Sequence, residues 1–219
     1  MRTMHIQEIR SKAPFEEIDY VFLKSVLKEY AQPRNKIQSL LKSKDLIRIK
    51  KGLYVFGPKA KRIPYCKESL ANLIYGPSAI SLEYALGFYG LIPERVEEIS
   101  SITPRRHKEF TTPLGRFSYD HLHPKRYALG ITQLEFPNNH FVLFATQEKA
   151  LCDTLVLKCP LFRNKNNLEK FLLEDMRLEH EHLPKFDKKL IEKITKEYNH
   201  SNLYLLSDYL YGEHHANRR

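Results

Sequence analysis

The sequence predicts an α+β protein built from two modules, and three observations lead to this prediction. The 219 residues are 42% hydrophobic and 28% charged, which is ordinary for a globular protein of one or two domains. Residues 1–63 contain fifteen Lys or Arg and six Asp or Glu, so they carry +9 of the net charge of +10. Residues 1–60 show short helical patterns and a hairpin, whereas residues 64–219 show a few strands followed by several helices.

The first module, residues 1–60, contains two adjacent predicted helices. Apolar side chains recur at helical spacing from Tyr20 to Tyr30, and Asp19 before them is a suitable N-cap. This helix should end near Ala31, because Pro33 disfavours helical geometry in the residue that precedes it. Pro33 then suits the first turn of a second helix, where its missing N–H costs nothing.

The second predicted helix has a polar face opposite its apolar stripe of Ile37, Leu40 and Leu41. Amide side chains can offer a donor and an acceptor to adenine, and cationic side chains can meet phosphate. The pattern therefore suits contact with duplex DNA, although a solvated helix surface would show the same pattern. The candidate DNA-contacting residues of this helix are Arg34, Asn35, Lys36, Gln38, Ser39 and Lys42.

A basic hairpin follows the second helix. Residues 46–49 and 53–56 predict two short strands, and Gly52 between them can adopt the positive φ of a tight turn. The two lysines of the hairpin turn, Lys50 and Lys51, would lie along the phosphate backbone of DNA. Alternatively, the turn is only exposed to solvent, and its lysines prevent an edge strand from pairing with another strand. Two helices and a basic hairpin together predict a winged helix-turn-helix DNA-binding domain over residues 1–60. The candidate contacts of the hairpin are Arg48, Lys50 and Lys51.

The size of the first module bears on how it would bind an operator. One such module buries roughly 600–1,000 Å² of surface on DNA. Tight binding therefore predicts two copies on an inverted repeat, or a contribution from the second module. We expect a monomer or weak dimer that pairs on DNA. A second basic stretch could contact DNA, contact an acidic partner or form an exposed loop; it consists of Arg105, Arg106, His107 and Lys108.

The second module, residues 64–219, is predicted to be a mixed α/β domain with a small sheet and a helical carboxyl-terminal half. Helices are expected near residues 70–74 and 82–89, and strands at 98–103, 115–122 and 141–144. The segment Phe-Val-Leu-Phe at 141–144 shows no alternation, so we expect a strand that is buried on both faces. The expected N-caps of four later helices are Thr146, Asn166, Asp187 and Ser201.

Enzymatic chemistry has little support in the sequence. There is no glycine-rich nucleotide-binding motif and no H-E-x-x-H motif. We therefore expect no catalytic residue and no cofactor. A metal-dependent nuclease that the first module targets to DNA is the alternative, and a regulator whose second module binds a small ligand is another. For the nuclease, folding would have to bring together the carboxylates of Asp120, Glu135, Glu148 and Asp153.

Metal binding also has little support. His121 and His123 could share a metal ion on one face of a strand, but no third ligand is evident. His180 and His182 have the same spacing and are expected to be solvated. The three cysteines, Cys66, Cys152 and Cys159, form no C-x-x-C pair, and we expect them to be free thiols.

Nothing in the sequence indicates a membrane protein. No run approaches the ~18 uninterrupted apolar residues of a membrane span. The first residues lead into no apolar stretch of the kind that a signal peptide contains. We therefore expect a cytoplasmic protein with no membrane partner.

Four segments resemble one known family. They are LIRIKKGLYVF at 46–56, SAISLEYALGFYGLIPERV at 78–96, PLGRFSYDHL at 113–122 and FATQEKALCDTLVL at 144–157. In these segments the chain resembles the AbiE-type antitoxins of type IV toxin–antitoxin systems, and the resemblance covers roughly residues 20–160. It implies an amino-terminal winged helix that binds operator repeats and represses its own operon. It also implies a carboxyl-terminal antitoxin domain that opposes a nucleotidyltransferase-like toxin without catalysis of its own, with or without direct contact.

Overall fold

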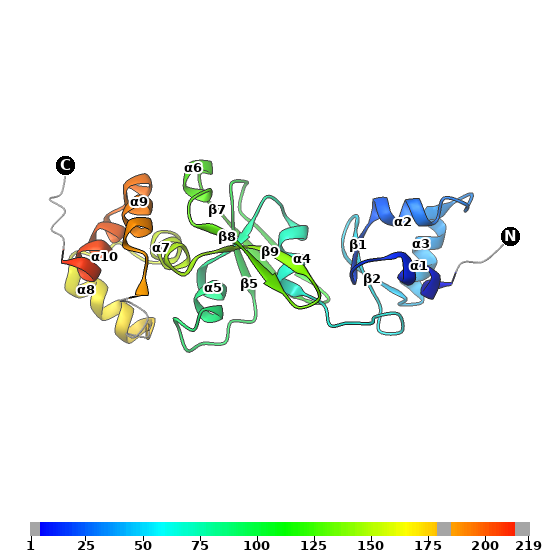
Figure 1. The fold of residues 1–219 in the computed structure, drawn as a ribbon, viewed down its shortest axis with the longest axis horizontal. Coiled ribbons are helices and arrows are strands. Elements are labelled where there is room, and N and C mark those ends of the chain that lie inside the picture. The colour runs from blue at the N-terminus through cyan, green and yellow to red at the C-terminus, as the bar shows by residue number, and fades with distance from the viewer. Residues whose placement is uncertain (1–4, 179–184, 213–219) are drawn as a thin grey trace.

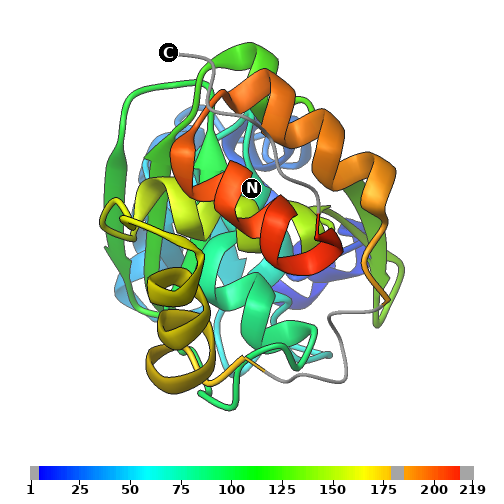
Figure 2. The same ribbon diagram turned by 90° about the vertical axis from the view of Figure 1, so that its left-hand side faces the viewer.

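The computed structural model describes residues 5–178 and 185–212. These residues form a mixed α+β fold with a three-stranded and a six-stranded sheet. The small sheet and its helices lie at one end of an elongated molecule, the large sheet lies in the middle, and the last helices lie at the other end (Figure 1). Viewed from that other end, α9 and α10 lie in front of the large sheet (Figure 2).

The amino-terminal part follows the order helix, strand, helix, helix, strand, strand. Its sheet is antiparallel, in the order β1-β3-β2. Gly52 in the β2–β3 turn has a φ of 88°, which confirms the expected left-handed turn residue. The elements are α1 (Ile6–Lys12), β1 (Glu17–Asp19), α2 (Tyr20–Val26), α3 (Pro33–Lys42), β2 (Leu46–Lys50) and β3 (Leu53–Phe56).

The two predicted helices of this part exist, but the first is shorter than expected. The Asp19 carboxylate accepts from the N–H of Phe22, which confirms it as the N-cap of α2. Helix α2 ends at Val26 rather than near Ala31, because the chain then turns more tightly, with the N–H of Tyr30 bonded to the carbonyl of Leu27. Helix α3 begins at Pro33, as predicted.

The central strand of the small sheet, β3, is buried on both faces. Tyr54 and Phe56 of β3 pack in one hydrophobic cluster with the helices α1 to α3. Leu53 and Val55, whose side chains point to the opposite face, join the larger cluster of the second module. This strand is therefore enclosed between the helices of its own module and the second module.

Polar side chains also connect the two modules. The Glu17 carboxylate of β1 lies 2.8 Å from Nε2 of His140, and both side chains are almost fully buried. The same carboxylate oxygen accepts from the hydroxyl of Ser69 at 2.7 Å. Nδ1 of His140 lies 2.9 Å from the carbonyl of Pro137, an acceptor. These contacts place the first module in a defined position against the large sheet.

The large sheet has the order β6-β7-β5-β4-β9-β8. Pairs β5–β7 and β4–β9 are parallel, and the other pairs are antiparallel. Strands were predicted at 98–103, 115–122 and 141–144, and the structure contains one at each place, whereas β4, β6 and β8 were not predicted. The bounds are β4 (Ala79–Ile80), β5 (Ile99–Thr103), β6 (Lys108–Thr112), β7 (Gly115–His121), β8 (Ile131–Phe136) and β9 (His140–Ala145).

The expectation that the strand at 141–144 is buried on both faces was wrong. His140, Val142 and Phe144 of β9 are buried, but Phe141 is 59% and Leu143 40% exposed. The outward side chains lie at the surface, where Phe141 borders a hollow of about 470 Å³ between the two modules. An apolar run without alternation can therefore reflect one buried face and one apolar surface patch.

Helices make up most of the chain after β9. Thr146 and Asp187 cap α7 and α9 as predicted. The other two expected caps were wrong: Asn164 caps α8 instead of Asn166, and His200 caps α10 instead of Ser201. None of the described helices has the length and apolar character needed to cross a membrane. The helices of the second module are α4 (Lys67–Ile74), α5 (Leu82–Phe88), α6 (Pro124–Tyr127), α7 (Gln147–Leu157), α8 (Lys165–Lys170), the π-helix η1 (Phe171–Asp175), α9 (Lys188–Tyr198) and α10 (Ser201–Tyr211).

Candidate nucleic-acid interface

A hollow of about 600 Å³ lies between α3 and the β2–β3 hairpin. Four of the predicted DNA contacts line it: Arg34 and Gln38 from α3, and Arg48 and Lys51 from the hairpin. Two structural elements thus bring cationic and amide side chains to one concave surface. A concave, positively charged surface of this kind suits a polyanionic partner.

The polar face of α3 points outward because its opposite face is fixed in the core. Ile37 and Leu40 are 3% and 4% exposed and pack in the cluster of the first module. Burial of these two side chains sets the rotation of the helix about its axis. Of the nine predicted contacts, Lys36 and Lys50 are half-buried, and the exposed ones are Arg34, Asn35, Gln38, Ser39, Lys42, Arg48 and Lys51.

Neighbouring side chains orient three of the residues on α3. The guanidinium Nε of Arg34 donates to the hydroxyl of Tyr20 at 3.3 Å. The amide of Asn35 donates to the side chain of Gln32. The amino group of Lys36 lies 5.8 Å from the centre of the Tyr30 ring, which explains its partial burial. Arg34 is therefore held at the edge of the hollow.

Lys50 points in a different direction from the other hairpin residues. Its amino group donates to the carbonyl of Ile74, the last residue of α4. Burial lowers the pKa of Lys50, and the positive charges of Lys108 and Arg105 lower it further. Three cations from both modules therefore lie close enough to repel one another.

The second basic stretch lies beside Lys50. Its four residues, 105–108, are all exposed. The cationic groups of Arg105 and Lys108 lie 5.8 and 5.7 Å from the centre of the Tyr75 ring. Among the described residues, neither these two side chains nor Lys50 has a carboxylate within ion-pair distance. Clustered cations without counter-charges favour an external anion.

Three of the four carboxylates of the nuclease alternative, Asp120, Glu148 and Asp153, have partners within the fold. Asp120 lies 2.7 Å from Lys158 and 3.3 Å from His107. Glu148 accepts from the N–H of Asp187 at 3.0 Å, and Glu135 is exposed on β8. Within residues 5–178 and 185–212, no group of three or more His, Cys, Asp or Glu side chains could hold a metal ion.

The predicted histidine pair is also used within the fold. Nδ1 of His121 lies 2.8 Å from the carbonyl of Arg105, and the ring of His123 caps α6. His180 and His182 lie outside the described residues. The three cysteines are free: Cys152 is buried, and Cys66 and Cys159 are half-buried.

Sequence reasoning missed a buried polar network around α7. The side chains of Lys149 and Asp153 are fully buried, and their charged atoms are 2.9 Å apart. The hydroxyls of Tyr198 and Ser81 donate to the Asp153 carboxylate at 2.5 and 2.8 Å. Burial, followed by the charge of Asp153, raises the pKa of Tyr198. A Lys–Asp spacing of four inside the otherwise apolar pattern of α7 was the available signal.

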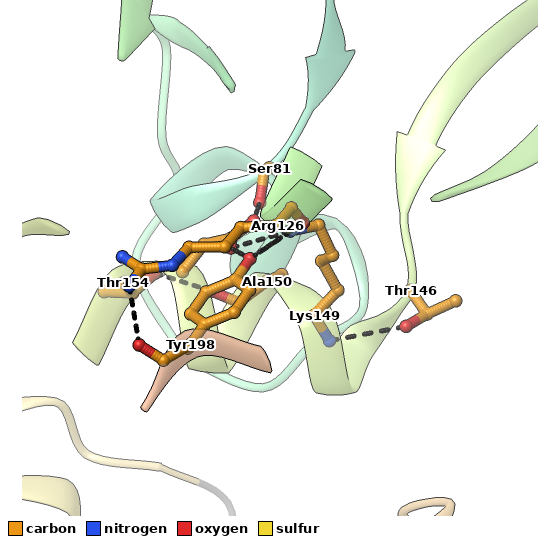
Figure 3. Close-up of polar contacts among 8 residues, drawn as sticks. Ser81, Arg126, Thr146, Lys149, Ala150, Thr154 and Tyr198 are labelled. Atoms are coloured by element: carbon orange, nitrogen blue, oxygen red, sulfur yellow. Dashed lines mark hydrogen bonds and ion pairs between the residues drawn. The ribbon is translucent and has the colours of Figure 1, made fainter. Parts of the chain in front are cut away.

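This network joins elements that are distant in the sequence (Figure 3). Besides Asp153, the Lys149 amino group contacts the carbonyl of Arg126 at 3.1 Å and the hydroxyl of Tyr198. The guanidinium of Arg126 in turn donates to the carbonyl of Tyr198 at 2.7 Å. The network thus fixes α6, α7 and α9 together.

Comparison with known proteins does not assign the chain to a family. No protein-family model matches the chain, and no curated protein matches its sequence. Its function must therefore be argued from the charge, exposure and geometry of its own side chains.

Proposed function

We propose that the protein is a sequence-specific DNA-binding transcriptional repressor, and that its amino-terminal module is a winged helix-turn-helix. Helix α3 is then the recognition helix, and the β2–β3 hairpin is the wing. The observation that carries the proposal is the hollow between α3 and the hairpin, with Arg34, Gln38, Arg48 and Lys51 around it. Both elements face one partner across this hollow.

In this mechanism α3 enters the major groove. Its amide and hydroxyl side chains, Asn35, Gln38 and Ser39, would read the edges of bases. The cations of α3 and the hairpin would neutralise phosphates, and this contributes affinity that does not depend on sequence. Affinity should therefore fall steeply with salt, while specificity comes mainly from the three uncharged side chains.

The second module would extend the contact. Arg105 and Lys108 form one uncompensated basic patch with Lys50 of the wing. Phosphates that flank the groove would relieve the repulsion among the three cations. The first module alone would bury little surface on DNA. Arg105 and Lys108 of this patch would add DNA contacts from the second module.

Removal of this patch gives a direct measurement. The double variant Arg105→Ala/Lys108→Ala should bind all duplexes more weakly. The slope of log K against log salt should become shallower by about 1.8, because each phosphate contact contributes about 0.9. Binding isotherms over a salt series would show this change. An unchanged slope would mean that the second basic stretch does not touch DNA.

Base reading by α3 makes a separate prediction. Gln38→Ala should reduce the discrimination between a selected site and a scrambled duplex by roughly 1–3 kcal/mol. Affinity for the scrambled duplex should stay the same, because the amide contacts no phosphate in this mechanism. Gln7→Ala, at an exposed glutamine on α1, is the matched control. Equal discrimination by Gln38→Ala and the parent would exclude a base contact at this position.

We also propose that the repressor is the non-catalytic antitoxin of a type IV toxin–antitoxin system and acts in the cytoplasm. The four resembling segments support this, two of which contribute β2, β3 and α7. Its partner would be a nucleotidyltransferase-like toxin encoded by the neighbouring reading frame. Expression of both proteins should restore growth that the toxin alone arrests.

The non-catalytic part of the proposal has its own test. Labelled duplex incubated with the protein and magnesium or manganese should remain intact. Cleavage that the substitution Asp120→Ala abolishes would instead support the metal-dependent nuclease. Failure of co-expression to restore growth would remove the antitoxin role and leave the DNA-binding proposal standing.

A further inference from the structure

The two edges of the large sheet differ in chemistry. Strand β6 forms one edge; its first two residues, Lys108 and Glu109, are charged and exposed, and Lys108 is the last residue of the second basic stretch. Charged side chains on an edge strand oppose pairing with another strand. Strand β8, with the sequence Ile-Thr-Gln-Leu-Glu-Phe, forms the other edge and carries one charge, at Glu135.

The backbone of β8 is open on one side. Among the described residues β8 pairs with β9 alone, and β9 is the one element that packs extensively against it. Alternate N–H and C=O groups of an edge strand point away from its neighbour. Gln133 and Glu135 are exposed, and Ile131, Leu134 and Phe136 are half-buried. The strand therefore offers a row of free donors and acceptors.

Apolar side chains lie close to this edge. Phe88, at the end of α5, is 49% exposed, and its ring centre is 5.7 Å from that of Phe136. On the outward face, the exposed Phe141 and Leu143 lie opposite Glu135 and Gln133 in the register of β8 and β9. Apolar surface beside an open strand is typical of a site where another strand adds to a sheet.

We propose that a second copy of this chain occupies the edge, with the two β8 strands antiparallel about a two-fold axis. Such an interface is self-complementary, so each contact occurs twice. A two-fold axis perpendicular to the sheet leaves every side chain on the same face of the sheet, and residues that lie opposite each other in antiparallel strands share a face. One residue of β8 must therefore lie on the axis, opposite its own copy in the second chain. Two registers place most of the strand in contact: one centred on Gln133 and one centred on Leu134.

The side chains select the register centred on Leu134. In it Thr132 lies opposite Phe136, Leu134 lies opposite its own copy, and Gln133 lies opposite Glu135, so that an amide meets a carboxylate. The register centred on Gln133 would instead place Glu135 opposite the apolar Ile131. Cross-strand pairs of matching chemistry stabilise a sheet, whereas mismatched pairs do not.

A contact of five paired residues on each side is smaller than a standard protein interface. The dimer is therefore weak in free solution. Two copies on neighbouring half-sites would have a high effective concentration, and the same contact would then make binding cooperative. The pairing itself does not depend on DNA binding, and both tests below use the protein without DNA.

Disulfide cross-linking tests the pairing. Proteins carrying Gln133→Cys and Glu135→Cys should form a linked dimer on mild oxidation when mixed, in several-fold higher yield than either variant alone. Burial raises the pKa of the Cys66 and Cys159 thiols to about 11, so the parent should contribute little background at neutral pH. Glu109→Cys mixed with Thr111→Cys, the matched pair on β6, should not cross-link. A mixture that links no better than its components overturns the proposal.

Sedimentation equilibrium tests the register. Gln133→Lys should associate at least as tightly as the parent, because its lysine meets Glu135. Gln133→Lys/Glu135→Lys should raise the dimer dissociation constant about tenfold or more, because lysine then meets lysine twice. The same changes on β6, Glu109→Lys/Thr111→Lys, should have no effect. A parent that stays monomeric at every concentration, or a double-lysine variant that dimerises like the parent, contradicts the pairing.

Discussion

Replacing Arg34, Arg48 and Lys51 together by glutamate should lower the affinity for any duplex by roughly three orders of magnitude or more. Each side chain lines the hollow between α3 and the hairpin. A hydrogen bond to a charged group contributes about 1.5–3 kcal/mol, and the proposed mechanism contains three such bonds to phosphate that this variant would lose. The slope of log K against log salt should become shallower by about 2.7. Fluorescence anisotropy with labelled duplex measures both quantities.

A control with the same change in charge separates the site from the net charge. Lys189, Lys193 and Lys196 are exposed on α9, at the opposite end of the molecule from α3 (Figure 1). Their replacement by glutamate should change affinity only slightly, because a Debye length is about 10 Å at 0.1 M salt. Equal losses in the two triple variants would show that DNA attraction comes from overall charge rather than from a groove-reading surface.

Removal of the Asp153 carboxylate should be the most destabilising single change. Asp153→Ala leaves the Lys149 ammonium fully buried without its counter-charge, and the loss of one partner of a buried pair costs about 3–5 kcal/mol. The hydroxyls of Tyr198 and Ser81 lose an acceptor at the same time. Urea unfolding of parent and variant measures the difference in free energy of unfolding, provided that the slopes are equal.

Two further variants show whether the network acts as argued. Lys149→Met/Asp153→Leu removes both charges and should be less destabilising than Asp153→Ala, because no buried charge remains unpaired. Glu174→Ala removes an exposed partner of Lys170, 3.7 Å away, and should change stability by less than about 1 kcal/mol. A loss below about 1 kcal/mol for Asp153→Ala would mean that water or another group replaces the carboxylate.

Local chemistry made parts of the fold predictable. The caps at Asp19, Thr146 and Asp187 follow from short polar side chains placed just before an apolar helical stripe. Pro33 at the start of α3 and Gly52 in the hairpin turn follow from the backbone geometry that these residues favour. Each of these features depends on a few neighbouring residues, so the sequence is sufficient to place it.

Features that depend on distant residues were not predictable. Strand β4 has two residues and exists because β5 and β9 lie on either side of it. The direction of Lys50 depends on Ile74, and the partner of Asp153 at Tyr198 is 45 residues away. The exposure of Phe141 likewise depends on which elements pack against β9. Sequence patterns record apolar character and spacing, and they do not record which element arrives from elsewhere in the chain.

The central claim is that α3 and the β2–β3 hairpin form the surface that contacts duplex DNA. Hydrogen–deuterium exchange of the protein with and without a duplex selected from a random pool tests it most directly. The expected result is protection concentrated in residues 33–52, with a smaller effect at 105–108. Absence of any selectable duplex, or protection confined to the carboxyl-terminal helices α8 to α10, would contradict the claim.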